Sequence, residues 1–378
     1  MFNKKFIKRL EAQKKSGLYR NPPEIAKRDG RLLHINGKKM INFASNDYLG
    51  FGSSEAVKTI VADNFKKYGS SSSSSRLVTG NYSAIREAEK AFAAYFNYEA
   101  ALFFPSGYQA NIGLISTLFD KGDKLVFDKH VHASTVKGIS LSGADFTGYR
   151  HNSLSHLEKK IKTAGEEGCA VITESLFSMD GDFADFKAIN ELKSRYGFIC
   201  IADEAHSYGA LGDKGKGISG GVADIGVGTF GKAFGLFGAF VLLPALYRDY
   251  LVNFASPYIY TTSLPEAHGA ATTEILSLIE KADDKRDHLQ KISRFTKITL
   301  EANGFKTAGD AHILAIEIGD EEKTVQITQA LQKKNIFTFP ARFPTVPLGR
   351  AIIRLSLTSM HTEEDVLALS TALKQISG

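Results

Sequence analysis

Short apolar segments recur along the middle of this chain, between about residues 46 and 279, and stretches of helical length separate them. The segments are Ala100–Phe104, Lys124–Phe127, Ala170–Thr173, Phe198–Ala202, Ile225–Thr229 and Ala239–Leu243. A short apolar run bounded by polar residues is typical of a strand that is buried on both faces. Alternation of such strands with helices predicts the α/β class, with a mostly parallel central sheet covered by helices.

The N-terminal segment has a different pattern. Met1–Arg20 is basic and places Phe2, Phe6 and Leu10 at helical spacing, so we expect an amphipathic helix packed against the rest of the protein. A transit peptide has a similar composition, but Glu11 interrupts the basic run and the packed helix is the better interpretation.

Turn and cap signals organise the rest of the two ends. Asn36-Gly37 lies between the apolar stretches of segment 31–43, which predicts a short hairpin. The charged segment 280–286 indicates the surface of one long connecting helix. Thr362 and Asp365 resemble a capping box that opens a final helix. Further strands are expected near residues 312–318 and 351–357.

Composition excludes several classes of protein. The chain has 378 residues, 43% of them hydrophobic and 23% charged, which indicates a globular protein with more than one structural unit. Its two cysteines, Cys169 and Cys200, argue against a disulfide framework or a thiolate zinc site and suit a reducing compartment. We therefore expect a cytoplasmic protein without a structural metal.

Charge and hydropathy narrow the possible partners. No apolar run approaches the roughly 20 residues that span a bilayer, so no membrane association is expected. The net charge of +6 is modest and does not indicate nucleic acid binding. It would favour an anionic substrate such as a coenzyme A thioester.

Two motifs at the ends of predicted strands carry the chemistry. Lys232 lies in Thr-Phe-Gly-Lys-Ala-Phe-Gly, and the sequence Asp203-Glu-Ala-His206 precedes it. Pyridoxal phosphate (PLP) chemistry needs these groups: a lysine that bonds to the cofactor, an acid that keeps the pyridine nitrogen protonated, and an imidazole at the ring hydroxyl. Taken singly, the lysine could be a solvated surface residue, and the acid and histidine could cap a helix or bind a metal.

Other strand ends supply the remaining parts of such a site. Ser106 and Gly107 follow one strand and open a helix, which suits a phosphate dianion but is also an ordinary helix cap. His132 follows the next strand and could lie flat on a cofactor ring. Ser178 offers a hydroxyl near the ring oxygen, although Ser, Asp and Gly clusters are usually turns. The ordered combination favours the PLP interpretation.

The chain resembles the α-oxoamine synthases, which are fold-type I PLP enzymes that condense an amino acid with an acyl-CoA. The matching motifs are Gly17–Arg20, Asn42–Gly50, Ser106–Asn111, His132–Ser134, Phe177–Asp182, Asp203–Gly209, Thr229–Gly235, Tyr260–Pro265 and Pro344–Pro347. The resemblance implies a homodimer with shared active sites. The domains that we expect are an N-terminal helix and hairpin (1–45), a PLP-binding large domain (46–285) and a C-terminal α+β domain (286–378).

The resemblance also implies residue roles. Lys232 would carry PLP, Asp203 would pair with its ring nitrogen and His132 would stack on the ring. The ring oxygen and the phosphate would take the remaining cofactor-binding residues: His206, Ser178, Ser106, Gly107, Tyr108, Thr229 and the partner's Thr262. Substrates would be bound by Asn46 and Arg354 at the carboxylate, and by Arg20 and Thr345 on the acyl side.

The sequence departs from the family in two places. Ser71, Ser73 and Ser74 stand where family members usually have glycine, inside the run Ser70–Ser75. Serine tolerates a positive φ less well, so we expect a different path or a mobile polar loop there. Ile85 stands where the family often has histidine.

Three functions remain to be separated. The Thr229–Gly235 and Pro344–Pro347 motifs favour the branch that condenses L-alanine with a pimeloyl thioester in biotin synthesis. A sibling synthase with another amino acid and acyl pair is the alternative, and a catalytically silent partner subunit is a third. A dinucleotide-binding dehydrogenase would need Gly-x-Gly-x-x-Gly directly after a strand, whereas the glycines between 212 and 221 follow Asp203–His206 and indicate a loop.

Overall fold

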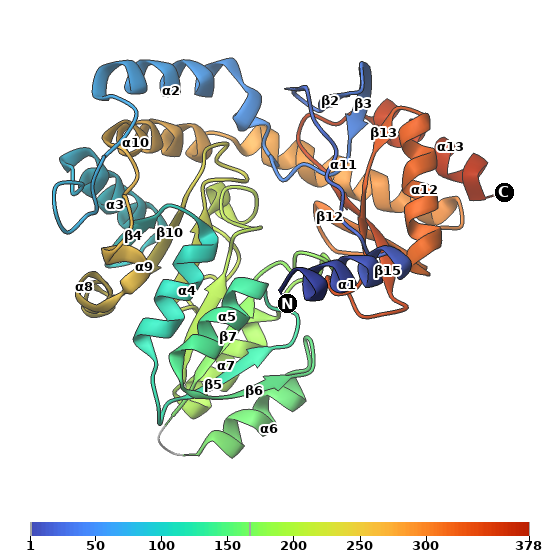
Figure 1. Cartoon of the computed structure of the whole chain (residues 1–378). Coiled ribbons are helices and arrows are strands. Elements are labelled where there is room, and N and C mark those ends of the chain that lie inside the picture. The colour runs from blue at the N-terminus through green and yellow to red at the C-terminus, as the bar shows by residue number, and fades with distance from the viewer. Residues whose placement is uncertain (1, 166–167, 378) are drawn as a thin grey trace. The chain divides into compact units, whose positions relative to one another are not determined.

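The computed structural model describes residues 2–165 and 168–377 (Figure 1). The chain divides into two compact units. Unit 1 comprises Met1–Gly50, Met179–Asp182 and Asp287–Gly378, and unit 2 comprises Phe51–Ser178 and Phe183–Arg286. The N-terminal helix and hairpin thus share a unit with the C-terminal part, whereas the sequence had suggested three consecutive segments.

Unit 2 is built around a seven-stranded sheet of order β4-β10-β9-β8-β7-β5-β6. The strands are β4 (Ala100–Phe104), β5 (Lys124–Asp128), β6 (Asp145–Tyr149), β7 (Ala170–Glu174), β8 (Ile199–Asp203), β9 (Ile225–Thr229) and β10 (Ala239–Leu243). In this sheet β10 alone runs in the direction opposite to the other six strands. The predicted strands and the mostly parallel sheet are confirmed. The sequence analysis missed β6, an edge strand whose residues are mostly exposed or half-buried.

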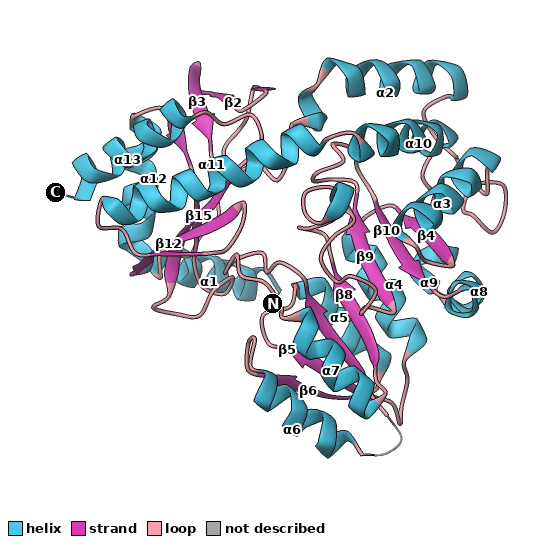
Figure 2. Ribbon diagram, turned by 180° about the vertical axis from the view of Figure 1, so that it is seen from behind, coloured by secondary structure: helices cyan, strands magenta, loops and turns pink. Residues whose placement is uncertain are grey.

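Helices cover both faces of this sheet (Figure 2). The helices of unit 2 are α2 (Glu55–Tyr68), which packs on α10, and α3 (Ser83–Phe96), α4 (Gly107–Leu118), α5 (Ala133–Ser142), α6 (Leu154–Ala164), α7 (Phe186–Tyr196), α8 (Ala245–Phe254), α9 (Ser256–Ile259) and α10 (Glu266–Glu280), with short 3-10 turns η1 (Phe51–Ser53) and η2 (Asp213–Gly215). Ile172 belongs to a core cluster with α4, α5, α8 and α9, whereas its neighbour Val171 belongs to a cluster with α6 and α7. Successive strand residues face opposite sides, so each strand contributes to two cores.

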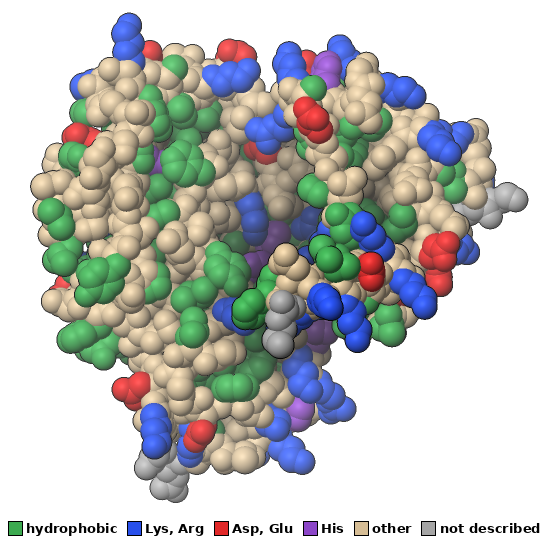
Figure 3. Space-filling model, viewed as in Figure 1, with side chains coloured by type: hydrophobic (Ala, Val, Ile, Leu, Met, Phe, Trp, Pro, Cys, Tyr) green, Lys and Arg blue, Asp and Glu red, His purple; other side chains and the backbone are tan. Residues whose placement is uncertain are grey.

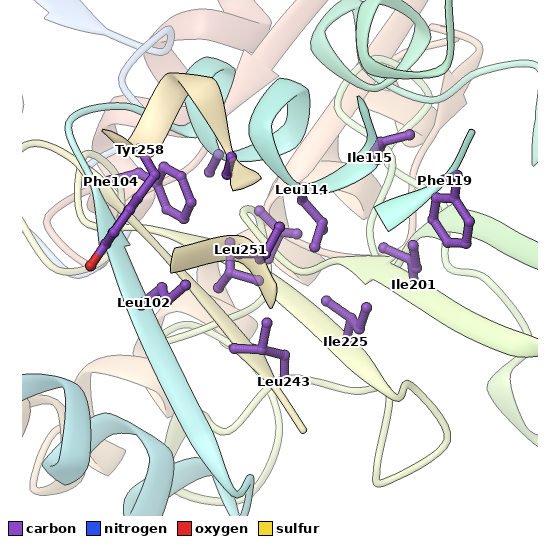
Figure 4. Close-up of a cluster of buried hydrophobic side chains, with 14 of the residues drawn as sticks. Leu102, Phe104, Leu114, Ile115, Phe119, Ile201, Ile225, Leu243, Leu251 and Tyr258 are labelled. Carbon is purple, nitrogen blue, oxygen red and sulfur yellow. The ribbon is translucent and has the colours of Figure 1, made fainter. Parts of the chain in front are cut away.

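The larger of these two clusters contains no charged side chain (Figure 4). Leu114 and Ile115 of α4 lie with Ile201, Ile225 and Leu243 of three strands, and each is at most 1% exposed. This packing fixes α4, and therefore its N-terminus, against the sheet.

Unit 1 contains two four-stranded sheets, of order β1-β2-β3-β13 and β11-β12-β15-β14. Its elements are α1 (Phe2–Lys15), β1 (Lys27–Asp29), β2 (Leu32–Ile35), β3 (Lys38–Asn42), β11 (Thr307–Ala308), β12 (Ile313–Gly319), α12 (Glu321–Lys333), β13 (Ile336–Phe337), β14 (Phe339–Ala341), β15 (Ala351–Ser356) and α13 (Glu363–Ser377). The hairpin prediction is confirmed, because Asn36 and Gly37 have φ of 50° and 74° between β2 and β3. The capping box is also confirmed: Thr362 N–H donates to Asp365, and Asp365 N–H donates to Thr362.

Two expectations about helices are wrong. The helix α1 forms, but none of its described residues is buried, and Phe2, Phe6 and Leu10 are 75%, 53% and 53% exposed. Helical spacing sets which residues share a face but does not provide a surface for that face to pack on.

The charged segment 280–286 is not the middle of one helix. The helix α10 ends at Glu280 and α11 (Asp283–Ala302) begins after a break. Arg286 stabilises the break, because its buried guanidinium donates to the backbone oxygens of Ile279 and Gly209 at 2.8 and 3.2 Å. Carbonyl groups at a helix end need such donors. None of the described helices is long and apolar enough to cross a membrane.

Candidate active site

The predicted cofactor residues of unit 2 gather at one edge of its sheet. Parallel strands end at the same edge, and ligands of α/β sheets bind there. Ser106 follows β4, His132 follows β5, Ser178 follows β7, and Asp203 and Thr229 are the last residues of β8 and β9. The sheet topology thus brings together five residues that lie far apart in the sequence.

Lys232 lies on a tight turn that buried aromatic residues hold in place. Phe230 and Phe234, two residues before and after it, are 0% exposed and pack on Phe92 and Phe240. Gly235 closes the turn with φ of 72°, and a Cβ there would lie 2.3 Å from the backbone nitrogen of Gly52. The sequence therefore folds this turn so that Lys232 is half-buried rather than a solvated surface lysine.

The amine of Lys232 has a specific neighbour. Its Nζ lies 2.8 Å from Nε2 of His206, which is buried at 8% exposure. His206 follows β8 and Lys232 follows β9, and these two strands are adjacent in the sheet. The structure thus brings together the two motifs that the sequence singled out.

Asp203 is oriented by two donors. Its Oδ1 accepts a hydrogen bond from the Ala205 N–H at 3.0 Å, and its Oδ2 accepts one from Asn111 Nδ2 at 2.9 Å. Asn111 is buried on α4 and also donates to Ser134 Oγ at 3.0 Å. Ser134 Oγ in turn lies 2.7 Å from Nδ1 of His132.

These contacts form one continuous chain, His132–Ser134–Asn111–Asp203. It links the two predicted ring-contacting residues through two residues to which the sequence analysis gave no role. Asn111 and Ser134 did lie inside quoted motifs, and a polar residue on the buried side of a helix is a signal that could have identified them.

The ring of His132 is exposed in the isolated chain, yet its charged form is disfavoured. Partial desolvation by its surroundings lowers the pKa of His132, and the Lys232 amine lowers it further, whereas the Asp203 carboxylate opposes the shift. A neutral imidazole suits a residue that is to lie against a cationic ring.

Glu174 is an acidic group that the sequence analysis missed. It is the last residue of β7, it pairs in register with Asp203 on β8, and it is 2% exposed. Burial raises the pKa of Glu174 well above its ordinary value, and the Asp203 charge adds to this, while Lys232 and the backbone N–H groups of His132 and Ser178 oppose it. Burial thus favours the protonated form of Glu174, beside the hydrogen-bonded carboxylate of Asp203.

The start of α4 matches an anion site. Ser106 is the N-cap, and its hydroxyl accepts from the Gln109 N–H at 3.2 Å. The first N–H groups of a helix, here those of Gly107 and Tyr108, lack partners within the helix. A Cβ at Gly107 would meet only Ala239, at 4.0 Å, so a ligand can approach the backbone closely. The cap and phosphate interpretations are compatible.

The two predicted threonines are placed differently. The Thr229 hydroxyl donates to the Gly238 oxygen at 3.0 Å and accepts from the Gly231 N–H at 3.1 Å, so it would have to rotate to donate to a phosphate. Thr262 has an exposed side chain.

The predicted substrate residues lie in unit 1. Arg354 on β15 is 5% exposed and donates to Ser356 Oγ at 2.6 Å, and both its terminal nitrogens lie 3.4 Å from Asn46 Oδ1. The structure thus brings Asn46 and Arg354 together. Arg20 and Thr345 are exposed on loops of the same unit.

The glycines between 212 and 221 form a loop around η2, as predicted, and not a strand-to-helix turn. Buried Glu204 holds this loop by accepting the N–H groups of Ile218 and Ser219. The dinucleotide-binding alternative therefore has no support in the geometry.

This set of groups fits PLP: a half-buried lysine amine beside an imidazole, a hydrogen-bonded carboxylate, and an open helix N-terminus at one sheet edge. Glu174 Oε1 is buried and has no hydrogen-bond partner among the described residues. An orphaned polar atom of this kind is uncommon away from functional sites.

Comparison with known proteins agrees with this chemistry. A family model described as aminotransferase class I and II matches residues 38–373. A Bacillus mycoides protein, provisionally named 8-amino-7-oxononanoate synthase, is 37% identical over 366 residues, which are 95% of this chain and 93% of the relative.

Two solved structures are similar over most of the chain. Serine palmitoyltransferase from S. paucimobilis, solved with PLP–myriocin bound, has a TM-score of 0.91 and 28% identity, and the match covers 98% of this chain and 96% of that one. An 8-amino-7-oxononanoate synthase from Francisella tularensis has a TM-score of 0.78 and 32% identity, with coverage of 89% and 98%.

Fold and comparisons together define a PLP-dependent transferase of fold-type I. Within that class, the chain belongs to the α-oxoamine synthases, the acyltransferases that join an amino acid to an acyl thioester.

Proposed function

We propose that this enzyme condenses L-alanine with a pimeloyl thioester and releases 8-amino-7-oxononanoate, CO2 and the free thiol, a step of biotin synthesis. The observation that carries a condensing role is the Lys232 amine at 2.8 Å from His206, at the sheet edge that also holds Asp203. The choice of alanine and pimeloyl rests on the names of the relatives, at 37% identity and 32% identity.

Bound PLP supplies an electron sink that stabilises negative charge at the substrate α-carbon. Lys232 would hold the cofactor through its amine and, once the amino acid has displaced it, accept the α-proton on Nζ. His206 Nε2, at 2.8 Å, would keep that amine within the site and share its proton.

The other residues would orient and hold charge. Asp203 would keep the proton on the ring nitrogen, with its two oxygens fixed by Ala205 and Asn111. His132 would lie against the ring face, and Ser178 and His206 would orient the ring hydroxyl. Each of these roles depends on a fixed geometry, which the hydrogen bonds to buried partners provide.

The phosphate would be bound at the start of α4 by the N–H groups of Gly107 and Tyr108 and by the hydroxyls of Ser106 and Thr229. Asn46 and Arg354 would bind the carboxylate of the amino acid, since a guanidinium binds a carboxylate with two parallel hydrogen bonds. Arg20 and Thr345 would contact the acyl substrate.

A homodimer is part of the proposal, with the partner's Thr262 completing the phosphate site. Hydrophobic side chains gather over the region where Figure 1 places α4, α5, α8 and α9, on the face seen in Figure 3. Leu141, Leu246 and Phe254, on α5 and α8, are 63%, 74% and 63% exposed. Exposed apolar groups at this density suit a protein interface. The sparse cysteines support a cytoplasmic location.

Serine palmitoyltransferase, at a TM-score of 0.91, makes a sibling reaction the second candidate. The test is free thiol release by the PLP-loaded enzyme, with alanine, glycine or serine against pimeloyl-, acetyl- or palmitoyl-CoA. Release confined to alanine with pimeloyl-CoA is expected. Preference for another pair would retain the family and reject the biotin assignment. A formed holoenzyme that releases no thiol with any pair would favour a carrier-protein donor or a silent subunit.

A further inference from the structure

The serine run is a bonded element and not a free polar loop. Ser72 is 4% exposed, and its hydroxyl lies 2.8 Å from the Ser263 oxygen and 3.0 Å from the Ser74 oxygen. The Ser263 N–H donates back to the Ser74 oxygen at 2.9 Å. Two segments that are far apart in sequence are thus joined in both directions. We call the Ser72, Ser74 and Ser263 contacts the serine clamp.

Backbone geometry accommodates these serines with little strain. Of Ser71, Ser73 and Ser74, which replace family glycines, only Ser73 has a positive φ, of 51°. The expected difficulty is therefore confined to one residue. The clamp itself depends on the hydroxyl of Ser72, which lies between these positions.

Gly80 also contacts the clamp through its backbone. The Ser263 hydroxyl donates to the Gly80 oxygen at 3.1 Å, and the Gly80 N–H donates to the Ser75 oxygen at 2.9 Å. A Cβ at Gly80 would lie 2.4 Å from Ser263 Oγ and 2.8 Å from the Ser74 oxygen. Only glycine allows this close approach.

A buried ion pair anchors the clamp to the large sheet. Arg76 and Glu89 are 8% and 5% exposed and form two hydrogen bonds of 2.8 and 3.0 Å. Arg76 also donates twice to Asn81 Oδ1, and Glu89 Oε1 accepts the Phe103 N–H of β4 at 3.0 Å. Both ends of the loop from Arg76 to Asn81 are thereby fixed to α3 and β4, and a buried pair of this kind is costly to break.

The clamp ends immediately beside an exposed residue. Thr262 directly precedes Ser263, and its side chain is exposed. Tyr260 is 81% exposed on the same segment, and Leu77 and Val78 are 69% and 73% exposed on the loop behind Arg76. The hydrogen-bonded clamp therefore lies next to several exposed side chains.

We propose that the serine clamp, with Ser72 at its centre and the Arg76–Glu89 pair as its anchor, is a positioning device that presents Thr262 to the cofactor phosphate of the partner subunit. This inference rests on the proposed dimer in which the partner's Thr262 completes the phosphate site. Ser72 does not touch the cofactor; it fixes the backbone of the residue that follows Thr262. Its loss would allow the Thr262 hydroxyl to move out of hydrogen-bonding range, since sub-ångström placement decides such contacts.

The test measures the PLP dissociation constant of apo-enzyme by fluorescence titration, for Thr262→Ala, Ser72→Ala and the double variant. We expect Thr262→Ala to weaken binding about tenfold, the range for losing one hydrogen bond to a charged group. We expect Ser72→Ala to weaken it somewhat less. The double variant should match Thr262→Ala alone, because Ser72 acts through Thr262. Ser70→Ala, in the exposed part of the same run, is the matched control and should bind PLP normally.

Each other outcome is decisive. Unchanged PLP affinity in Ser72→Ala, with Thr262→Ala impaired, overturns the clamp while leaving the proposed dimer site intact. Additive losses in the double variant also overturn it. Normal affinity in Thr262→Ala removes the role of Thr262 and the inference with it, whereas thiol release from alanine and pimeloyl-CoA still tests the function separately. If Ser72→Ala unfolds, two further variants replace it: Ser72→Thr, which keeps the hydroxyl, and Glu89→Gln, which weakens the Arg76–Glu89 anchor. An unchanged PLP dissociation constant in Glu89→Gln, with Thr262→Ala impaired, overturns the role of the anchor.

Discussion

The carboxylates of Asp203 and Glu174 occupy paired positions on adjacent strands, yet they have different surroundings. Asp203 accepts hydrogen bonds from Asn111 and Ala205. Glu174 is fully enclosed, and burial with the neighbouring Asp203 charge raises its pKa. Two like charges this close are costly to form together, and burial makes Glu174 the acid that favours its protonated form.

This relationship predicts opposite responses to amide substitution. Glu174→Gln keeps a neutral group of the same shape and should retain kcat/KM within about threefold, whereas Glu174→Ala leaves two backbone N–H donors without a partner and should cost roughly tenfold or more. Asp203→Asn removes the charge at the ring nitrogen and should cost at least about a hundredfold. Thiol-release kinetics of the three variants provide the comparison. A loss in Glu174→Gln as large as that in Asp203→Asn would mean that Glu174 is ionised.

Lys232→Ala should abolish turnover and leave the fold intact. The side chain lies on a turn that Phe230 and Phe234 hold, so its truncation removes an amine and little packing. We expect a loss of about a thousandfold or more in kcat, with an unchanged melting temperature of the apo-protein. Lys187→Ala, on the exposed side of α7, is the control. Substantial activity in Lys232→Ala would refute the mechanism.

Asn111→Ala should impair the enzyme, although Asn111 has no proposed contact with a substrate. The Asn111 amide supports both Asp203 and Ser134, and leaving a buried acceptor unpaired costs about 1–3 kcal/mol. We expect kcat/KM to fall by roughly tenfold to a hundredfold and the acid limb of its pH profile to shift. Exposed Asn190 supplies the matched Asn→Ala control. A pH profile identical to that of the parent enzyme would reduce Asn111 to a packing residue.

The stability of the apo-protein should fall in mildly acidic solution. Burial lowers the pKa of His268 to about 4, despite its hydrogen bond to the Phe237 oxygen. The unfolded chain binds this proton near its ordinary pKa of about 6.5, so between those values the unfolded state carries more protons and stability decreases as pH falls. The shift corresponds to about 3 kcal/mol.

Melting temperatures measured from pH 7 down to pH 4 test this dependence. Burial also lowers the pKa of His361 to about 4, so the two histidines contribute in the same direction. His268→Gln should be less stable than the parent at pH 7 but should show a shallower decline on acidification. An equally steep decline would assign the pH dependence to other groups.

Local pattern was sufficient for much of the architecture. The predicted segments Ala100–Phe104, Ile225–Thr229 and Ala239–Leu243 coincide with β4, β9 and β10, because a short run of apolar residues between polar ones is typical of a strand that helices cover on both faces. The hairpin turn and the capping box were predicted for the same reason. Each depends on residues within a few positions of one another.

The sequence by itself also determined which groups stand at the strand ends, including Lys232, Asp203 and His132, because motif and strand are contiguous. Only the tertiary structure decided how those ends are connected. Asn111 reaches Asp203, and Ser72 reaches Ser263, across 92 and 191 residues, and such contacts depend on strand order and helix placement that no local pattern encodes. The exposed face of α1 and the break stabilised by Arg286 have the same origin. Periodicity and caps act over a few residues, whereas burial and hydrogen-bond partners depend on what the rest of the chain brings alongside.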